Sequence, residues 1–191
     1  MNTLIMLAPG VLDEFRRISP RLEGETDHMY RDSIGAHKDP ALHNPLGGLV
    51  TTAVGVLIDP VELALPLPWV RKDGLPATPE EIRAEWQKIK TWPNLNRDGA
   101  GAAKRLCELH LTRDGVREAA TTTLERMLWH LLRDFPELPE WPASAQLAVL
   151  LLVWAVGTDL VRKWPRLTAA LRGRDWATAA VESKIREAGN P

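Results

Sequence analysis

The feature that most constrains the fold is a helix-length run of apolar residues in the C-terminal third. Residues 145–156 read AQLAVLLLVWAV, with Gln146 as the single polar side chain among them. A helix that is apolar on every side is stable only when other elements surround it, and this run is too short to span a bilayer. Ser144 precedes the run as a candidate N-cap, and Gly157 follows it as a candidate helix end. We therefore expect a buried central helix with further helices packed around it.

Helical patterns flank this run on both sides. Residues 10–18 place apolar side chains at helical spacing, and Pro20 and Gly24 predict the end of that helix, with Glu23 just beyond it. Thr78–Glu81 combines an N-cap threonine, a proline at the first position and the glutamate of a capping box. Helices are expected at about 79–92, 98–111, 116–135, 158–163, 166–173 and 175–187.

Only one stretch has a convincing β pattern. Residues 49–58 read LVTTAVGVLI, which predicts a strand or the second arm of a hairpin. The residues before it, from about 29, are rich in turn formers. The expected fold is α+β and mostly α: one domain over residues 1–191, with a small β-hairpin lobe at about 19–59 and a helical bundle at about 60–191.

Composition excludes several classes of protein. The chain has 191 residues, enough for a core without disulfides or metal, and its single cysteine, Cys107, is expected in that core. A net charge of −1 argues against a nucleic-acid binder. The N-terminus lacks a positive region before its brief apolar run, so we expect no signal peptide, synthesis in the cytoplasm and no stable membrane insertion. Eight tryptophans against one tyrosine and two phenylalanines slightly favour a carbohydrate ligand.

Two carboxylates and a hydroxyl are the candidate catalytic groups. Glu23 lies where the first helix is expected to end, Asp32 follows nine residues later in a polar segment, and Thr51 begins the β region. Hydrolysis of a sugar–sugar bond requires one acid that protonates the leaving oxygen and a second group that activates water. The nearby carboxylates Glu25 and Asp39 are alternatives for these two roles.

The order of these features resembles the phage-type lysozymes, the muramidase branch of the lysozyme-like superfamily. Glu23-Gly24 is similar to the family's Glu-Gly at the end of the first helix, and Tyr30, Asp32 and Gly35 fall at the family's offsets of seven, nine and twelve. Residues 48–60, GLVTTAVGVLIDP, resemble the Thr-x-Gly-x-Gly strand, in particular that of a group of phage endolysins. The similarity extends through LLLVWAVG and the C-terminal helices, and so covers the chain from about residue 10 to its end.

The resemblance implies a peptidoglycan hydrolase that cleaves the β-1,4 bond between N-acetylmuramic acid and N-acetylglucosamine. It implies Glu23 as the general acid, Asp32 as the residue that positions or activates water, and Thr51 as the hydroxyl that helps to hold this water. It gives substrate-binding roles to Tyr30, Thr52 and Gly55. It also implies no cofactor or metal, a monomer, glycan strands as partner, and action on the cell wall or periplasm after release or delivery.

Departures from the family pattern leave two other functions open. The separation of Asp32 from Thr51 is nineteen residues, longer than is usual in the family, so residues 36–48 are expected to form an inserted flap. This altered spacing is compatible with a lytic transglycosylase, which uses one glutamate and closes an anhydro ring. Ala53 and Val56 replace a strand glycine and a polar residue. The insertion and Val56 favour a non-catalytic module that binds glycan or protein. A histidine-containing metal cluster is disfavoured because the spacing of its members matches no standard zinc site: His28, His37, Asp39 and His43.

Overall fold

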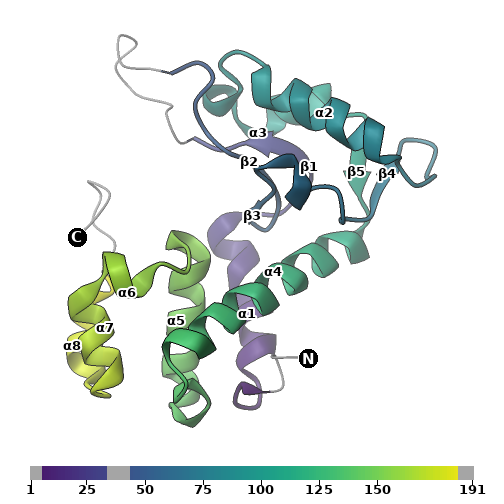
Figure 1. The fold of residues 1–191 in the computed structure, drawn as a ribbon. Coiled ribbons are helices and arrows are strands. Elements are labelled where there is room, and N and C mark those ends of the chain that lie inside the picture. The colour runs from purple at the N-terminus through teal and green to yellow at the C-terminus, as the bar shows by residue number, and fades with distance from the viewer. Residues whose placement is uncertain (1–5, 34–43, 185–191) are drawn as a thin grey trace. The chain divides into compact units, whose positions relative to one another are not determined.

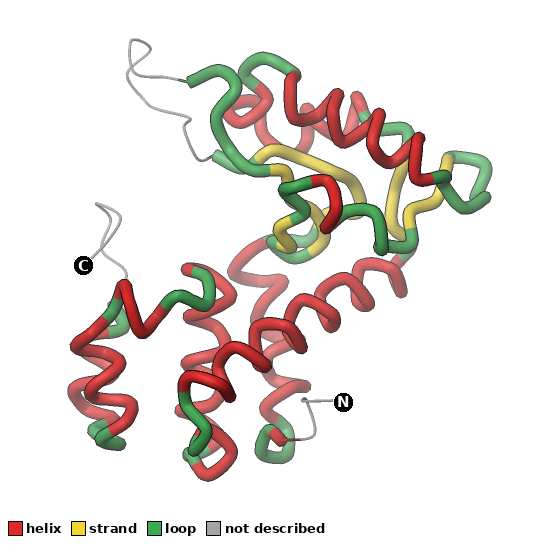
Figure 2. The backbone as a smooth tube through the Cα atoms, in the orientation of Figure 1, coloured by secondary structure: helices red, strands yellow, loops and turns green. Residues whose placement is uncertain are grey.

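The structure, a computed structural model, describes residues 6–33 and 44–184. The fold is α+β and mostly helical, as predicted from the sequence (Figure 1). The chain divides into two compact units, one formed by residues 22–122 and the other by residues 1–21 together with 123–191. Every strand of the described chain lies in residues 22–122, the sheet-bearing unit; we call the remainder the helical unit (Figure 2).

The helical unit has an apolar core around the predicted central helix. Its elements are most of α1 (Val11–Glu23), the second half of α4 (Arg113–Asp134), η3 (Leu138–Glu140), α5 (Ala143–Val156), α6 (Leu160–Lys163), α7 (Pro165–Arg172) and α8 (Trp176–Glu182). On α5, Leu150, Val153 and Trp154 are buried, and the Trp154 ring packs edge-on against Phe15 of α1 with centroids 5.1 Å apart. The helix ends at Val156, and Gly157 follows it with a φ of +84°, so the predicted end is confirmed. The helix begins at Ala143 after Pro142, so the expectation that Ser144 is its N-cap is wrong.

The first helix is longer than the sequence predicted. It continues through Pro20 and ends at Glu23, so the expectation that Pro20 stops it is wrong. A proline within a helix removes one N–H donor and crowds the preceding turn, and here the helix continues for only three residues beyond it. Gly24 follows with a φ of +75°, a left-handed conformation that ends helices and suits glycine. Glu23 is therefore the last residue of α1.

The sheet-bearing unit contains two antiparallel sheets and two helices. Its elements are β1 (Thr26–Arg31), β2 (Val50–Ala53), β3 (Val56–Leu57), η2 (Val61–Leu63), β4 (Trp69–Arg71), α2 (Pro79–Thr91), α3 (Leu95–Leu106), β5 (Leu109–Leu111) and the start of α4. The first sheet has the order β1-β2-β3, and β4 pairs with β5 in the second. Residues 60–122, assigned to the helical lobe from sequence, thus belong to the same compact unit as the hairpin.

The second sheet is a correction to the sequence analysis. Residues 109–111 were expected to continue a helix, but α3 ends at Leu106 and these residues form β5. Strands of three residues carry almost no periodic signal in the sequence, which is why β4 and β5 were not predicted. The two strands pair with each other, Trp69 with Leu111 and Arg71 with Leu109. The strand β1 was also missed, because its residues have no clear alternation of apolar and polar side chains.

The start of α2 confirms the predicted capping box. The Thr78 hydroxyl accepts a hydrogen bond from the Glu81 backbone N–H at 3.3 Å, and the Glu81 carboxylate accepts one from the Thr78 N–H at 2.7 Å. Two N–H groups that lack partners within the helix are satisfied in this way. In the part of the chain that the structure describes, no helix combines the length and apolarity needed to cross a membrane.

Candidate functional site

The first sheet brings three of the predicted site residues together. Tyr30 of β1 is paired with Thr51 of β2, and directly opposed residues of antiparallel strands project side chains on the same face. Beyond the end of β1, the Asp32 N–H donates to the Leu49 carbonyl at 3.1 Å, and the Leu49 N–H donates to Asp32 Oδ1 at 3.0 Å. Asp32 is therefore held next to the strand that carries Thr51, although nineteen residues separate them in the sequence.

The turn between β2 and β3 brings Glu23 to the same sheet. Gly55 lies in this turn with a φ of +71°, and a Cβ atom built on it would lie 3.3 Å from Glu23 Oε2 and 3.6 Å from the Cβ and Cγ atoms of Glu23. The backbone of the hairpin turn thus packs directly against the carboxylate. A side chain at position 55 would be strained by the positive φ and would push the Glu23 carboxylate aside, so the backbone favours glycine here.

Electrostatics connects both carboxylates to Tyr30. Desolvation raises the pKa of the Tyr30 phenol, and the negative charges of Asp32 and Glu23 raise it further. Desolvation also raises the pKa of Glu23, even though part of its side chain is exposed. No described residue forms a hydrogen bond or ion pair with the Glu23 carboxylate, which leaves the carboxylate without a group that favours its charged form. Glu23 is therefore a carboxyl suited to retaining its proton, and its charge and that of Asp32 both act on Tyr30.

The two threonines of β2 have different surroundings. Thr51 donates its hydroxyl hydrogen to the Leu49 carbonyl at 3.1 Å, and a hydroxyl oxygen in this state can still accept a hydrogen bond. Thr52 has no exposed surface, and its hydroxyl donates to the His28 carbonyl at 3.0 Å, which ties β2 to β1. The predicted substrate contact of Thr52 is therefore corrected to a structural role, since a fully buried side chain does not reach a ligand.

A buried arginine that the sequence analysis missed holds the segment leading into β2. Arg31 is 1% exposed, and its guanidinium donates to the carbonyls of Lys90 and Trp92 at the end of α2 and of Pro45, at 2.6, 2.6 and 2.7 Å. The carbonyl end of a helix carries partial negative charge, which suits a cation. No sequence signal identifies such a residue, because arginine is rarely buried.

An ion pair supports the same segment from the other side. Lys90 lies 2.6 Å from Asp59 and also donates to the Gly48 carbonyl at 3.2 Å, while the Val50 N–H donates to Asp59 at 3.2 Å. A Cβ atom on Gly48 would lie 2.6 Å from the Asp32 carbonyl oxygen, so the chain approaches Asp32 as closely as glycine allows. Together with Arg31, these contacts fix the position of Leu49, which bonds both Asp32 and Thr51.

The alternative site residues are less well placed or lie outside the described residues. Glu25 lies in the link between α1 and β1 and is exposed, as Glu23 is, but the contact with Gly55 is made by Glu23. Asp39, as well as Gly35 and most of the expected flap at 36–48, falls outside the described residues. Cys107 is buried as expected, and burial together with the Glu85 charge raises the pKa of its thiol to about 12, so it is unreactive.

The histidine cluster considered in the sequence is only partly described. His28 is buried, with its ring nitrogens 2.8 Å from Asp27 Oδ1 and 2.8 Å from the Ala100 carbonyl. His37 and His43 fall outside the described residues. Across residues 6–33 and 44–184, no group of three or more His, Cys, Asp or Glu side chains is arranged to hold a metal ion.

Comparisons with known proteins give no match: no family model matches the chain, and neither the curated proteins nor the solved structures contain a significant relative. The resemblance to the phage-type lysozymes therefore rests on the residues quoted above. The arrangement of Glu23, Tyr30, Asp32 and Thr51 around one small sheet is the geometric basis for any functional assignment.

Proposed function

We propose that this chain is a peptidoglycan hydrolase of the lysozyme type, which cleaves the β-1,4 bond between N-acetylmuramic acid and N-acetylglucosamine. Glu23 protonates the glycosidic oxygen, and Asp32 with Thr51 orients the attacking water. The observation that carries the proposal is the packing of the Glu23 carboxylate against Gly55, in the hairpin that also presents Thr51 opposite Tyr30. These residues match the family pattern in both type and order.

The protonation chemistry supports this division of roles. A general acid must carry a proton at the working pH, and desolvation raises the pKa of Glu23 in that direction. The Leu49 N–H donates to Asp32 Oδ1 and so fixes the direction of this carboxylate beside β2. Thr51 is fixed by the Leu49 carbonyl, so its oxygen has a defined direction for accepting a hydrogen bond. Because the second acid acts on water, the expected stereochemical outcome is inversion at the anomeric carbon.

Ala53 supports the resemblance at a position where the sequence departs from it. The family pattern has glycine there, and Ala53 adopts a φ of +51°, in the left-handed region that glycine occupies without strain. The turn therefore has the backbone conformation that the family glycine would allow, despite the different residue. The departure changes a side chain of one methyl group and leaves the approach of Gly55 to Glu23 intact.

The decisive experiment is digestion of purified peptidoglycan by the wild-type protein and by Glu23→Gln, with the products identified by mass. Loss of the general acid should reduce cleavage by about a hundredfold to ten-thousandfold, while the matched change Glu25→Gln leaves it unchanged. Circular dichroism should show that both variants are folded. Normal cleavage by Glu23→Gln, or loss of cleavage in Glu25→Gln, would contradict the assignment.

The products separate the remaining functions. Muropeptides with a reducing end indicate hydrolysis, whereas anhydro products that lack one water indicate a lytic transglycosylase. Binding of glycan without any cleavage by the wild-type protein indicates a non-catalytic module. The enzyme acts on the cell wall or periplasm after release or delivery, and its partner is the glycan strand.

A further inference from the structure

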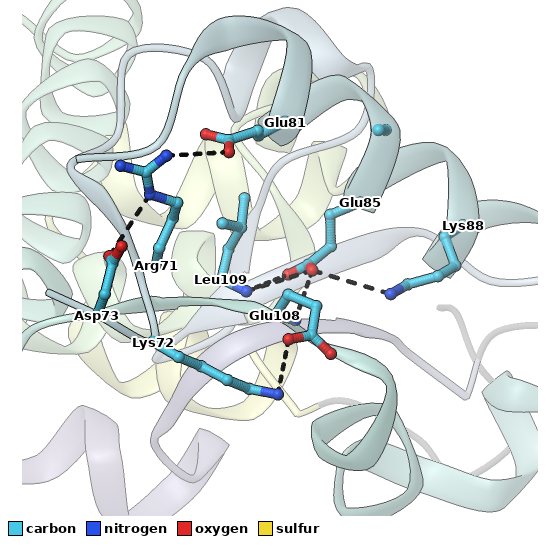
Figure 3. Close-up of a pocket in the computed structure, with 9 residues that line it drawn as sticks. Arg71, Lys72, Asp73, Glu81, Glu85, Lys88, Glu108 and Leu109 are labelled. Carbon is cyan, nitrogen blue, oxygen red and sulfur yellow. Dashed lines mark hydrogen bonds and ion pairs between the residues drawn. The ribbon is translucent and has the colours of Figure 1, made fainter. Parts of the chain in front are cut away.

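A charged cavity lies on the sheet-bearing unit between α2 and the second sheet (Figure 3). Its volume is about 520 Å³, within the range of small-molecule binding sites. Seven of its nine lining residues are charged, and each of the three cations lies within 4.0 Å of a lining carboxylate. None of these residues belongs to the proposed catalytic set.

One end of the cavity holds a loosely paired guanidinium. Arg71 Nη1 lies 3.3 Å from Glu81 Oε1, and its Nε lies 3.5 Å from Asp73 Oδ1. Arg71 Nε is buried and lacks a hydrogen-bond partner of good geometry among the described residues. This end therefore offers a cation with unused donor capacity, next to two carboxylates (Figure 3).

The other end also presents both signs of charge. Lys72 is 2.7 Å from Glu108, and both side chains are about two-thirds exposed, at 67% and 63%. Lys88 Nζ lies 4.0 Å from Glu85 Oε2. Glu85 itself is 5% exposed, and its carboxylate accepts hydrogen bonds from the backbone N–H groups of Glu108 at 2.6 Å and Leu109 at 3.0 Å. The floor of the cavity is thus held by hydrogen bonds to the buried Glu85, while the Lys72–Glu108 ion pair is exposed.

The pairing of these charges determines which ligands suit the cavity. Exposed ion pairs contribute only about 0–1 kcal/mol, so exchanging them for ligand partners costs little. A purely anionic ligand would leave the lining carboxylates without their cations, and a purely cationic ligand would leave the lining cations unpaired. A ligand with an ammonium and a carboxylate on neighbouring atoms satisfies both.

We propose that this cavity binds the zwitterionic group of an amino acid, with the ligand carboxylate at Arg71 or Lys72 and the ligand ammonium at Glu81 or Glu108. The apolar surface of Leu109 lies under the carbon chain of the ligand. The group belongs either to a free amino acid or to a peptide with an unblocked amino-acid head. The second source rests on the proposed function, because the stem peptides of peptidoglycan carry such groups.

Three probes of related structure test the charge requirement. Diaminopimelate carries two ammonium and two carboxylate groups, pimelate lacks the ammonium groups, and cadaverine lacks the carboxylates. Titration followed by backbone amide NMR should show diaminopimelate binding at least about fivefold more tightly than either of the others, with shifts centred on Glu108 and Leu109. Equal binding of pimelate or of cadaverine, shifts elsewhere, or no binding of diaminopimelate would each overturn the proposal.

Variants of the cavity provide the second half of the test. Arg71→Gln should weaken diaminopimelate binding about tenfold, and Lys72→Gln, at an exposed position, should weaken it about threefold without affecting folding. Arg105→Gln is the matched control, because Arg105 is an exposed arginine outside the cavity, and it should bind as wild type. Unchanged binding in both cavity variants would contradict the proposal.

Two further experiments test the source of the ligand and the independence of the two sites. Soluble muropeptides that end in diaminopimelate should compete with the free amino acid if the peptide is the natural source; failure to compete leaves the free amino acid as ligand. Glu23→Gln should bind diaminopimelate as wild type does, because Glu23 does not line the cavity. If the wild-type protein cleaves peptidoglycan but does not bind diaminopimelate, only this inference is contradicted. If it binds diaminopimelate but does not cleave peptidoglycan, only the proposed function is contradicted.

Discussion

The two units differ in the chemistry of their interiors. The helical unit is built on apolar and aromatic packing, such as the Phe15–Trp154 and Phe135–Trp141 pairs with ring centroids 5.1 and 5.5 Å apart. The sheet-bearing unit contains all of the described buried basic and acidic residues, which are His28, Arg31 and Glu85. Burying a charge costs several kcal/mol unless hydrogen bonds compensate for it. Arg31 and Glu85 meet this condition, because each is hydrogen-bonded to the backbone of another segment and so holds that segment in position.

Because of this difference, substitutions in the two units are expected to have different effects on stability and on the position of the candidate site residues. In the helical unit, a lost side chain leaves a cavity in apolar packing, whereas Glu23, Asp32 and Thr51 all lie in the other unit. In the sheet-bearing unit, the buried polar groups hold the segment before β2, the end of α2 and β5. Changes there should alter both the free energy of unfolding and the activity.

The largest effect is expected for Arg31→Met. Methionine fills much of the space but leaves three carbonyl oxygens without their donor, so the free energy of unfolding should fall by about 4 kcal/mol. Cleavage of peptidoglycan should fall too, because Leu49 loses the support that holds it beside Asp32. Urea unfolding and a dye-release assay measure the two effects. Arg105→Met, at an exposed position, should stay within about 0.5 kcal/mol of wild type. An equally small change for Arg31→Met would contradict the positioning role.

A similar loss of stability without loss of activity is expected for Leu150→Ala. Leu150 is fully buried on α5, and removing its side chain should lower the free energy of unfolding by about 3 kcal/mol. Cleavage per folded molecule, measured well below the new unfolding temperature, should equal that of wild type. A strong fall in activity at full folding would show that the helical unit also positions the site. That result would remove the proposed distinction between the units.

The third prediction concerns pH. The general acid must be protonated, and desolvation raises the pKa of Glu23, so cleavage should persist above pH 4.5, the ordinary pKa of the group, and decline as pH rises through the raised pKa. A raised folded-state pKa also contributes stability below the unfolded pKa that is lost as pH rises. Glu23→Gln should therefore be at least as stable as wild type at neutral pH. A pH–rate profile that falls at or below pH 4.5, or a destabilised Glu23→Gln, would disagree with the desolvated carboxyl.

The smallest effect is expected for Ala53→Gly. Glycine relieves about 1 kcal/mol of left-handed strain and costs about 0.4–1 kcal/mol through greater freedom of the unfolded chain. The two terms nearly cancel, so the free energy of unfolding should change by less than about 0.5 kcal/mol, and activity should be retained. Thermal unfolding provides the measurement, with Ala53→Val as the contrasting variant, since a β-branched residue at this φ of +51° should destabilise the turn. A loss above about 1.5 kcal/mol in the glycine variant would argue against a left-handed Ala53.

Much of the helical structure was predictable because its signals are local. The capping box at Thr78 and Glu81, the apolar run of α5 and the terminal Gly157 each depend on residues within a few positions of one another. Hydrogen bonds from one residue to the fourth before it make such patterns readable in the sequence. The error at Pro20 arose from the same local reasoning, because proline disfavours a helix without forbidding it.

Candidate site residues could be named from the sequence, whereas their arrangement could not be predicted from it. The resemblance named Glu23, Tyr30, Asp32 and Thr51 from their order in the chain. It did not reveal that Thr52 is fully buried, nor that Gly55 packs against the Glu23 side chain. Both facts depend on how β2 pairs with β1 and turns into β3.

The sequence by itself therefore predicted most of the helices and the class of fold, and it named the candidate catalytic residues. Only the tertiary structure decided the second sheet, the buried positions of Arg31 and Glu85, and the membership of residues 60–122 in the sheet-bearing unit. Strand pairing and burial of charge join residues that are tens of positions apart, such as Arg31 with Lys90 and Trp69 with Leu111. Their energies depend on contacts between distant segments, and no local pattern encodes those contacts.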